Sequence, residues 1–183
     1  MLRKALLTGA IISVWFTLAA HSALAKDAAE ISKDSQAALQ ALYKNVPKAK
    51  ELGGKALAVL VFPSVVKAGL GVGGQYGDGA LIKGGQTVAY YKTAGASVGL
   101  QAGAQKYGYA LFFMNANALQ QIDKADGFDI GVGPTVVVMD EGMAKSMTTT
   151  TMKDDIYAFI FDQKGLMAGF GLQGNKITKI NPK

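Results

Sequence analysis

The sequence predicts an α+β fold: a single β-rich domain of strongly coiled antiparallel sheet with an N-terminal amphipathic helix and a short central helix. Three observations favour this fold class. Apolar residues recur at helical spacing early in the chain, and the remainder consists mostly of short β-prone segments separated by turn residues. In addition, 23 of the 183 residues are glycine, and many of them occupy every second position.

Residues 1–25 have the three regions of a secretory signal. A basic pair precedes an uncharged apolar stretch, and residues 23–25 read Ala-Leu-Ala, which matches the A-x-A cleavage pattern. We expect cleavage before Lys26 and a periplasmic or secreted mature domain of residues 26–183. No Cys stands at the cleavage site to carry acyl chains, so we do not expect a lipoprotein. The mature length, 183 − 25 = 158, suits one domain.

The mature domain lacks four residue types that many active sites use. Arg3, Trp15 and His21, each the only residue of its type, all fall in the leader, and the chain has no Cys. Imidazole and thiolate catalysis, thiolate zinc sites and disulfides are therefore excluded. Removing Arg3 and Lys4 leaves 19 − 2 = 17 Lys against 13 acidic residues, a net charge of +4. We expect no enzyme, no cofactor, no metal and no nucleic-acid partner, but a mild preference for anionic partners.

Residues 27–45 predict the amphipathic helix, which Pro47 ends because the residue before a proline is kept out of the α region. Its apolar positions are Ile31, Ala38, Leu39, Leu42, Tyr43 and Val46. A lysine-bearing link to position 55 comes next. Residues 57–62 form a continuous β-prone run that predicts a strand buried on both faces and stopped by Pro63.

The rest of the chain predicts strands, turns and one short helix. Gly84 and Gly85 separate residues 81–83 from 87–91 and predict a two-residue hairpin turn. A strand over residues 107–114 precedes a short helix, capped by Asn115 or Asn117, that ends near residue 124. Further strands are expected at residues 128–139, 143–152, 156–161, 166–172 and 176–180, with turns at 162–165 and 174–175.

Glycines alternate with other residues over 69–79 and 95–105, and side chains alternate across a strand, so these glycines share one face. Repeated glycine weakens a strand, which implies either close approach to the backbone or sharp coiling. One interpretation is a tightly coiled sheet that carries the first helix. The other is a shallow groove for an acyl chain or partner, with the candidate residues Gly71, Gly73, Gly95, Gly99 and Gly103.

Two motif matches lack the context that their chemistry needs. Residues 69–74 fit G-x-G-x-x-G, but no acidic residue occurs between Asp78 and Asp123, so a dinucleotide site is not expected. Residues 64–67 fit S-x-x-K, but the two intervening valines favour a strand over the helix start that this nucleophile requires.

Residues 61–79 read Val-Phe-Pro-Ser-Val-Val-Lys-Ala-Gly-Leu-Gly-Val-Gly-Gly-Gln-Tyr-Gly-Asp-Gly, and they resemble the SYLF domain, a lipid-binding module of bacteria and eukaryotes. The resemblance continues through residues 99–105, 111–115, 132–134 and 164–169. It implies membrane binding through an N-terminal amphipathic helix and basic residues, with phosphoinositides as the lipid and actin as a partner in some eukaryotic members. A periplasm contains neither ligand, so we expect lipid binding to a different lipid.

We therefore expect a non-enzymatic periplasmic protein that binds lipid or a membrane surface, and that recognises anionic phospholipid. The candidate head-group contacts are Lys44, Lys48, Lys50, Lys55 and Lys67, and the candidate apolar anchor is Ile31, Leu39, Leu42 and Tyr43. The anchor requires the helix to leave the domain; otherwise the helix packs on its own sheet. Two alternatives stay open: an envelope adaptor that binds another protein through the glycine face, and a small outer-membrane β-barrel.

Overall fold

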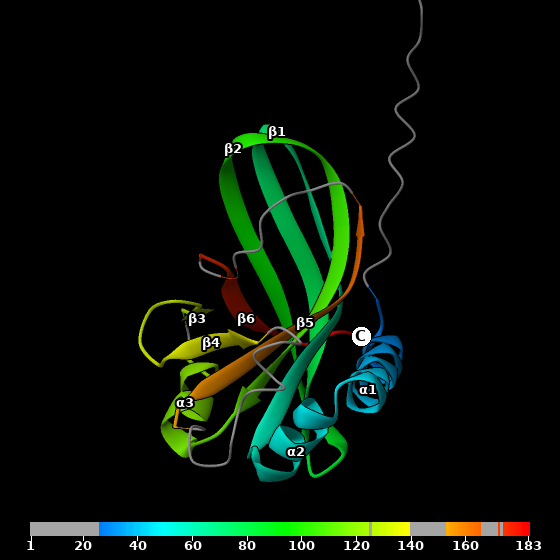
Figure 1. Ribbon diagram of the computed structural model, residues 1–183, viewed down its shortest axis with the longest axis vertical. Helices are drawn as coiled ribbons and strands as arrows, with labels where there is room; N and C mark the ends of the chain where they lie inside the picture. Colours follow the sequence, from blue (N-terminus) through cyan, green and yellow to red (C-terminus); the bar gives the residue numbers. More distant parts are fainter. Residues whose placement is uncertain (1–25, 125, 140–152, 166–171, 173) are drawn as a thin grey trace, which may run out of the picture.

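The computed structural model describes residues 26–124, 126–139, 153–165, 172 and 174–183 (Figure 1). The strand expected at 143–152 and nearly all of the one at 166–172 lie outside the described residues. The described elements are α1 (Ala28–Asn45), α2 (Pro47–Lys55), β1 (Ala58–Lys83), β2 (Gln86–Phe113), α3 (Ala116–Gln121), β3 (Phe128–Asp129), β4 (Val136–Met139), β5 (Ile156–Gly165) and β6 (Lys176–Ile180).

These strands form a six-stranded sheet in the order β3-β6-β2-β5-β4, with β1 paired to β2. The β1–β2, β2–β5, β2–β6 and β3–β6 pairs are antiparallel, as predicted. The β4–β5 pair is parallel, which the sequence pattern did not indicate. The β-rich, strongly curled character of the sheet is confirmed (Figure 1).

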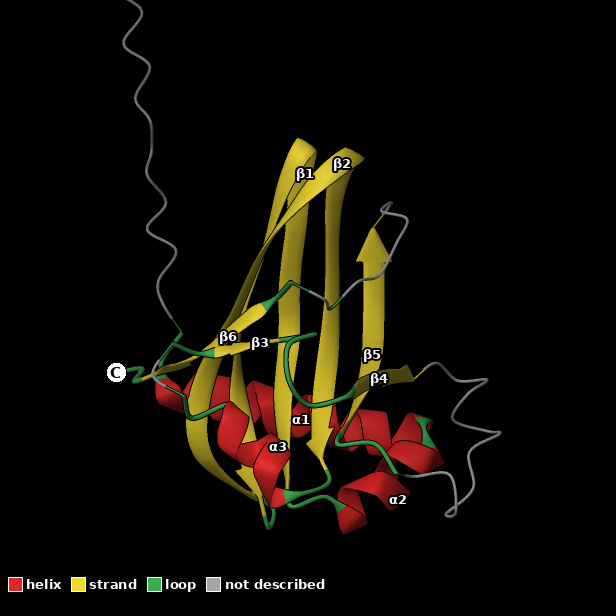
Figure 2. Cartoon of the chain, turned by 90° about the vertical axis from the view of Figure 1, so that its left-hand side faces the viewer, coloured by secondary structure: helices red, strands yellow, loops and turns green. Residues whose placement is uncertain are grey.

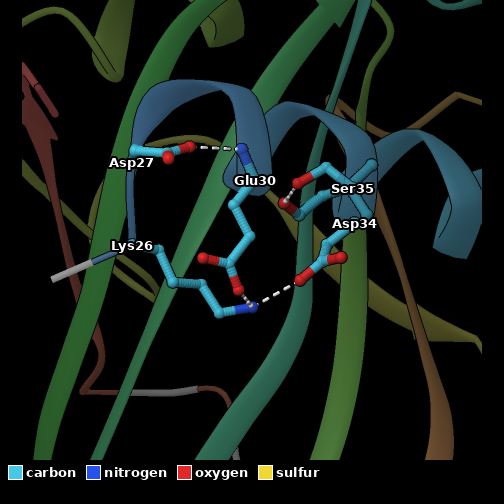
Figure 3. Close-up of polar contacts among 6 residues, drawn as sticks. Lys26, Asp27, Glu30, Asp34 and Ser35 are labelled. Carbon is cyan, nitrogen blue, oxygen red and sulfur yellow. Dashed lines mark hydrogen bonds and ion pairs between the residues drawn. The ribbon is translucent and has the colours of Figure 1, made fainter. Parts of the chain in front are cut away.

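Helix α1 begins and ends where the sequence predicts. The Asp27 carboxylate accepts a hydrogen bond from the Glu30 amide at 2.7 Å and caps the N-terminus. Lys26 bridges Glu30, at 3.3 Å, and Asp34 (Figure 3). The hydrogen bond to Asp34 raises the pKa of Lys26, so this ammonium stays charged. Val46 has left the helical region, with φ −128°, directly before Pro47.

The predicted lysine-bearing link is wrong, because residues 47–55 form helix α2. Pro47 occupies the first turn, where its fixed φ suits a helix and its missing N–H would have no partner anyway. Gly53 and Gly54 lower the intrinsic helix propensity of this segment. The helix forms nevertheless because its packing against the sheet stabilises it: Ala49 and Leu52 are both fully buried.

Strand β1 does not stop at Pro63. A register irregularity between Phe62 and Val65 accommodates the proline, and the strand continues to Lys83. Residues 58–62 are only 0–4% exposed, which confirms a segment buried on both faces. The hairpin turn is confirmed as well, because Gly84 and Gly85 have φ values of 57° and 80°, which side-chain-bearing residues rarely adopt.

The long β1–β2 hairpin folds over on itself at the end away from α2 (Figure 1). A Cβ added to Gly79 would lie 2.6 Å from Phe62 Cδ1, and one added to Gly77 would lie 2.7 Å from the Ser64 carbonyl oxygen. A Cβ on Gly69 would collide with Gly73 Cα. The glycines therefore let the second half of β1 lie directly against its first half.

The curled sheet has a core on each side. The outer side, on which α1 and α2 lie (Figure 2), buries Leu39, Leu42, Leu52, Val59, Val61, Phe112, Tyr157 and Phe159 among others. The inner side buries Leu60, Phe62, Val65, Tyr91, Tyr109, Leu111, Phe113, Ile122 and Ile177 among others. The first helix thus packs on its own sheet, but on the side opposite the glycine-lined interior.

Two other predictions are partly right. Asn115 caps α3 through a hydrogen bond that its side-chain oxygen accepts from the Ala118 amide at 2.9 Å. The strand expected at 128–139 is interrupted, because Gly131 and Gly133 take φ values of 100° and 95° and separate β3 from β4. Strand β5 also runs through the turn expected at 162–165.

Candidate lipid-binding surface

Four of the five predicted head-group lysines lie together where α1 meets α2. Lys44 lies in the last turn of α1, while Lys48, Lys50 and Lys55 belong to α2, which begins two residues after α1 ends. Lys44, Lys50 and Lys55 are exposed, and Lys48 is half-buried. We call these four residues the lysine corner.

Glu51 organises the lysine corner. Its carboxylate accepts from Lys48 Nζ at 2.7 Å and from Lys55 Nζ at 2.8 Å. These hydrogen bonds, that of Lys48 first, lower the pKa of Glu51, so the carboxylate stays ionised. In the described part of the chain Lys44 and Lys50 form no ion pair. Together, the four lysines and Glu51 carry a net charge of 4 − 1 = +3.

A cleft of about 700 Å³ opens beside the lysine corner, between the two helices, the start of β1 and the hairpin turn. Its lining includes Gln36, Leu39, Gln40, Tyr43, Lys50, Leu57, Val59, Ile82, Gly84 and Gly85. The apolar side chains among them come from α1, from β1 and from Leu57 just before β1, and Lys50 of α2 brings a cation to the lining. This volume is within the usual range for small-molecule sites.

Tyr43 combines an apolar contact with a polar group in this cleft. Its ring centroid lies 6.3 Å from that of Phe112, and its hydroxyl lies against Gly53 of α2. Burial raises the pKa of Tyr43, so the hydroxyl remains a neutral donor at neutral pH.

The other three anchor candidates face the sheet. Ile31, Leu39 and Leu42 are 1–4% exposed, so an apolar anchor made of these side chains requires α1 to leave the domain. Ser32 Oγ lies 2.7 Å from Thr87 Oγ1 of β2 and ties α1 to the sheet. The large apolar side chain exposed at the cleft is Leu57, at 43%. Sequence reasoning did not single it out because it belongs to an otherwise buried run.

Lys67 lies apart from the lysine corner. It is on the inner side of the curled sheet, opposite Gln105 of β2, and is 7% exposed. Of the groove candidates, Gly95 lies against Asn175 and Gln75, and Gly73 lies against Gly69. Gly103 is exposed, with φ 135°. The surroundings of Gly71 and Gly99 lie outside the part of the chain that the structure describes.

Neither a metal site nor a membrane-spanning helix occurs among the described residues. They hold no group of three or more His, Cys, Asp or Glu residues that could bind a metal ion. None of their helices is long and apolar enough to cross a membrane.

The comparisons with known proteins bear on the second half of the chain. Residues 94–182 match the family model described as Ysc84, Las17-binding protein actin regulator. This part of the chain matches the SYLF domain family. The SYLF match covers β2 from Ala94 onward together with α3 and β3 to β6, while the lysine corner precedes it. SYLF domains are binding modules rather than a known enzyme family. No curated protein matches the chain.

Proposed function

We propose that this SYLF protein is a non-enzymatic periplasmic protein that attaches to anionic phospholipid surfaces through the lysine corner. The observation that carries the proposal is the net charge of +3 that four lysines and one carboxylate place on a short helical corner beside an apolar cleft. The signal-like leader of residues 1–25 supports the periplasmic location.

Charge alone gives weak attachment. Each lysine near an anionic surface contributes on the order of 1 kcal/mol, so a net charge of +3 contributes roughly 3 kcal/mol. That corresponds to a dissociation constant weaker than about 1 mM. An apolar contribution is therefore needed, and the cleft beside Lys50 can supply it, with Leu57 exposed on its lining. In this proposal the lysines contact head groups while α1 stays on the sheet.

Vesicle sedimentation tests the electrostatic part. We expect the mature protein to co-sediment with phosphatidylglycerol-containing vesicles and much less with phosphatidylcholine vesicles. Salt should weaken binding, because the Debye length falls from about 10 Å at 0.1 M to about 3 Å at 1 M. Changing Lys44, Lys48, Lys50 and Lys55 to Gln should reduce binding to the anionic vesicles at least tenfold.

A matched variant separates position from charge. Lys33, Lys106, Lys124 and Lys164 are exposed and lie outside the lysine corner, and changing them to Gln removes the same four charges. This control should retain most of the binding. Equal losses in the two variants would mean that net charge acts without a defined surface and would contradict the proposal, as would equal binding to neutral and anionic vesicles.

A reversible cross-link tests whether α1 leaves the domain. The chain has no Cys, so the pair Ser32→Cys and Thr87→Cys introduces two thiols where the native hydroxyl oxygens are 2.7 Å apart. Oxidation would fix α1 to β2. We expect the oxidised variant to bind anionic vesicles as the reduced one does. Binding that disappears on oxidation and returns with reductant would show that Ile31, Leu39 and Leu42 are the anchor.

A protein partner is the second candidate, because the matching family model is described as a Las17-binding protein. The outer side of the bent hairpin offers exposed apolar side chains for such a contact, including Leu70 at 82% and Val72 at 67%. Cross-linking in intact envelopes with the wild type and with Leu70→Asp tests this role. A specific adduct that the variant loses would favour an adaptor.

A further inference from the structure

The inner side of the curled sheet changes from apolar to polar towards the bend. Near the hairpin turn it is filled by residues such as Phe62 and Tyr109, whose ring centroids are 4.8 Å apart. Towards the bend the inner positions carry polar side chains instead, namely Lys67, Gln75, Gln105 and Tyr107, joined by Asn175 from the segment before β6. We call these five residues the interior polar cluster.

The fold-over of β1 brings the cluster together. Lys67 pairs with Gln105 in the β1–β2 register. Gly77 lies against Val65, and Gly69 lies against Gly73. On one side of the fold-over, Lys67 lies midway between these two contacts. On the other side, Gln75 lies midway between them. Gln75 therefore lies across the interior from Lys67.

Hydrogen bonds connect one side of the cluster. The Tyr107 hydroxyl donates to Gln75 Oε1 at 2.6 Å, and Gln75 Nε2 donates to Asn175 Oδ1. Burial raises the pKa of Tyr107 to about 12, so this hydroxyl keeps its proton. The arrangement fixes Gln75 and Asn175 in position.

Three polar groups in the cluster nevertheless have no partner among the described residues. Gln105 is 4% exposed and Asn175 is 0% exposed, yet Gln105 Oε1 and Asn175 Nδ2 form no hydrogen bond there. Lys67, at 7% exposure, forms no hydrogen bond or ion pair within the described part of the chain. Buried polar groups are normally hydrogen-bonded, and a lysine ammonium normally meets a counter-charge or water. These groups indicate a ligand.

The three unpartnered groups specify the ligand's chemistry. An ammonium group and an amide N–H₂ both complement an oxyanion, while Gln105 Oε1 accepts only from an O–H or N–H donor. We infer that the interior polar cluster binds a hydroxyl-bearing oxyanion such as a phosphorylated polyol. The paired Gly69 and Gly103 lie next to Lys67 and Gln105 along the strands, and Gly103 is exposed, so bare backbone borders the cluster there.

This site is independent of the proposed membrane attachment. The lysine corner belongs to the helices on the outer side of the sheet, whereas Lys67 lies on the inner side. The same ligand chemistry has two sources, a phospholipid head group and a free small molecule. Glycerol 3-phosphate and phosphatidylglycerol vesicles are the probes that distinguish them.

Thermal unfolding and titration calorimetry test the inference. Glycerol 3-phosphate at about a hundred times its dissociation constant should raise the Tm of the mature protein by roughly 5 °C or more. Propyl phosphate, which lacks the hydroxyl groups, should bind several-fold more weakly because Gln105 Oε1 then stays unpaired. A response to the vesicles but not to glycerol 3-phosphate, if it depends on Lys67, would identify the source as a lipid head group.

Lys67→Met is the decisive variant, and Lys106→Met is its control, because Lys106 is a neighbouring exposed lysine of β2. Lys67→Met should abolish the ligand response and leave the Tm of the unliganded protein nearly unchanged, since Lys67 forms no hydrogen bond or ion pair within the described part of the chain. Lys106→Met should keep both properties of the wild type. The inference is overturned if neither probe gives a response that depends on Lys67, or if propyl phosphate binds as tightly as glycerol 3-phosphate.

Discussion

The two halves of β1 are held in different ways, although they belong to one continuous strand. Residues 58–62 are buried on both faces, between the two helices and the interior of the sheet. Beyond the irregularity at Pro63, and until the strand becomes buried again at Leu81 and Ile82, the outer face is exposed, with Val66 at 51% and Leu70 at 82%. There the inner face carries glycines and the interior polar cluster. Residues 58–62 are held by side-chain burial, and residues 66–79 by close backbone approach and polar contacts.

One part of the sheet therefore supplies most of the stability, and the other part carries the candidate ligand-binding groups. The covered half has many apolar contacts to lose, so its side chains dominate the free energy of unfolding. In the bare half the important feature is the missing side chain, since glycines permit the fold-over. Groups left without partners, such as Gln105 Oε1 of β2, occur opposite this second half. Four substitutions probe the contrast.

The largest effect is expected in the covered half. Phe112 is fully buried, and its ring centroid lies 5.4 Å from that of Phe159 in an edge-to-face contact. Phe112→Ala should lower the free energy of unfolding by about 3 to 5 kcal/mol. Urea titration monitored by circular dichroism would measure the change. A loss below about 1 kcal/mol would mean that this end of the sheet is not held by side-chain burial.

A smaller but still clear effect is expected where the two halves touch. Gly79→Ala places a methyl group 2.6 Å from Phe62 Cδ1 and should cost about 1 to 3 kcal/mol by overpacking. Gly74→Ala is the control, because its nearest neighbour lies 3.8 Å away, and it should cost less than about 1 kcal/mol. Equal midpoints for the two variants in urea would refute the close approach.

A carboxylate whose hydrogen bonds depend on pH lies near the start of β5, which pairs with β2. The Asp155 carboxylate accepts from the Thr135 amide at 3.0 Å and from Asn115 Nδ2 at 2.6 Å, and it links the strand ends of β4 and β5 to the start of α3. These hydrogen bonds, that of Thr135 first, lower the pKa of Asp155 below its ordinary 3.8.

The stabilisation from Asp155 is complete above the ordinary pKa and disappears as the pH falls through the lowered value. Asp155→Asn should therefore reduce stability by no more than about 1 kcal/mol at pH 7. It should also flatten the loss of stability that the wild type shows below about pH 4. Denaturant midpoints at pH 7 and pH 3 would measure both effects; parallel pH profiles would exclude this role.

The smallest effect is expected on the bare outer face. Leu70 is 82% exposed, so Leu70→Ser should change the free energy of unfolding by less than about 0.5 kcal/mol. Differential scanning calorimetry would detect a larger change. A loss above about 1 kcal/mol would show that something covers this face in solution, and the comparison between the halves would fail.

Local signals in the sequence predicted local structure well. Asp27 and Pro47 mark the ends of α1, two glycines set the hairpin turn, and Asn115 caps α3, because each acts within a few residues of itself. Helix α2 was missed because burial of Ala49 and Leu52 outweighs its two glycines. The predicted strand ended too early, at Pro63, because a proline at an irregularity within a strand has the same sequence signal as a proline that ends one.

The candidate site was predictable to a similar extent. The lysine corner is contiguous in sequence, so its members could be named together. The cleft could not be predicted, because it needs α2, which was read as a link, to lie beside the distant turn at Gly84. Lys67 looked like another surface lysine. Its burial depends on the fold-over of β1, which the alternation of glycines permits but does not specify.

The long β1–β2 hairpin also has a consequence for how fast the chain folds. Its pairs are local at the turn, where Lys83 faces Gln86, but Ala58 faces Phe113, a separation of 113 − 58 = 55 residues. Proteins whose contacts are distant in sequence fold slowly, because loop-closure entropy is lost before those contacts form. A chain of this topology therefore stays unfolded longer than a helical bundle of the same size. Under the periplasmic location proposed above, slow folding would keep the chain unfolded while it crosses the membrane.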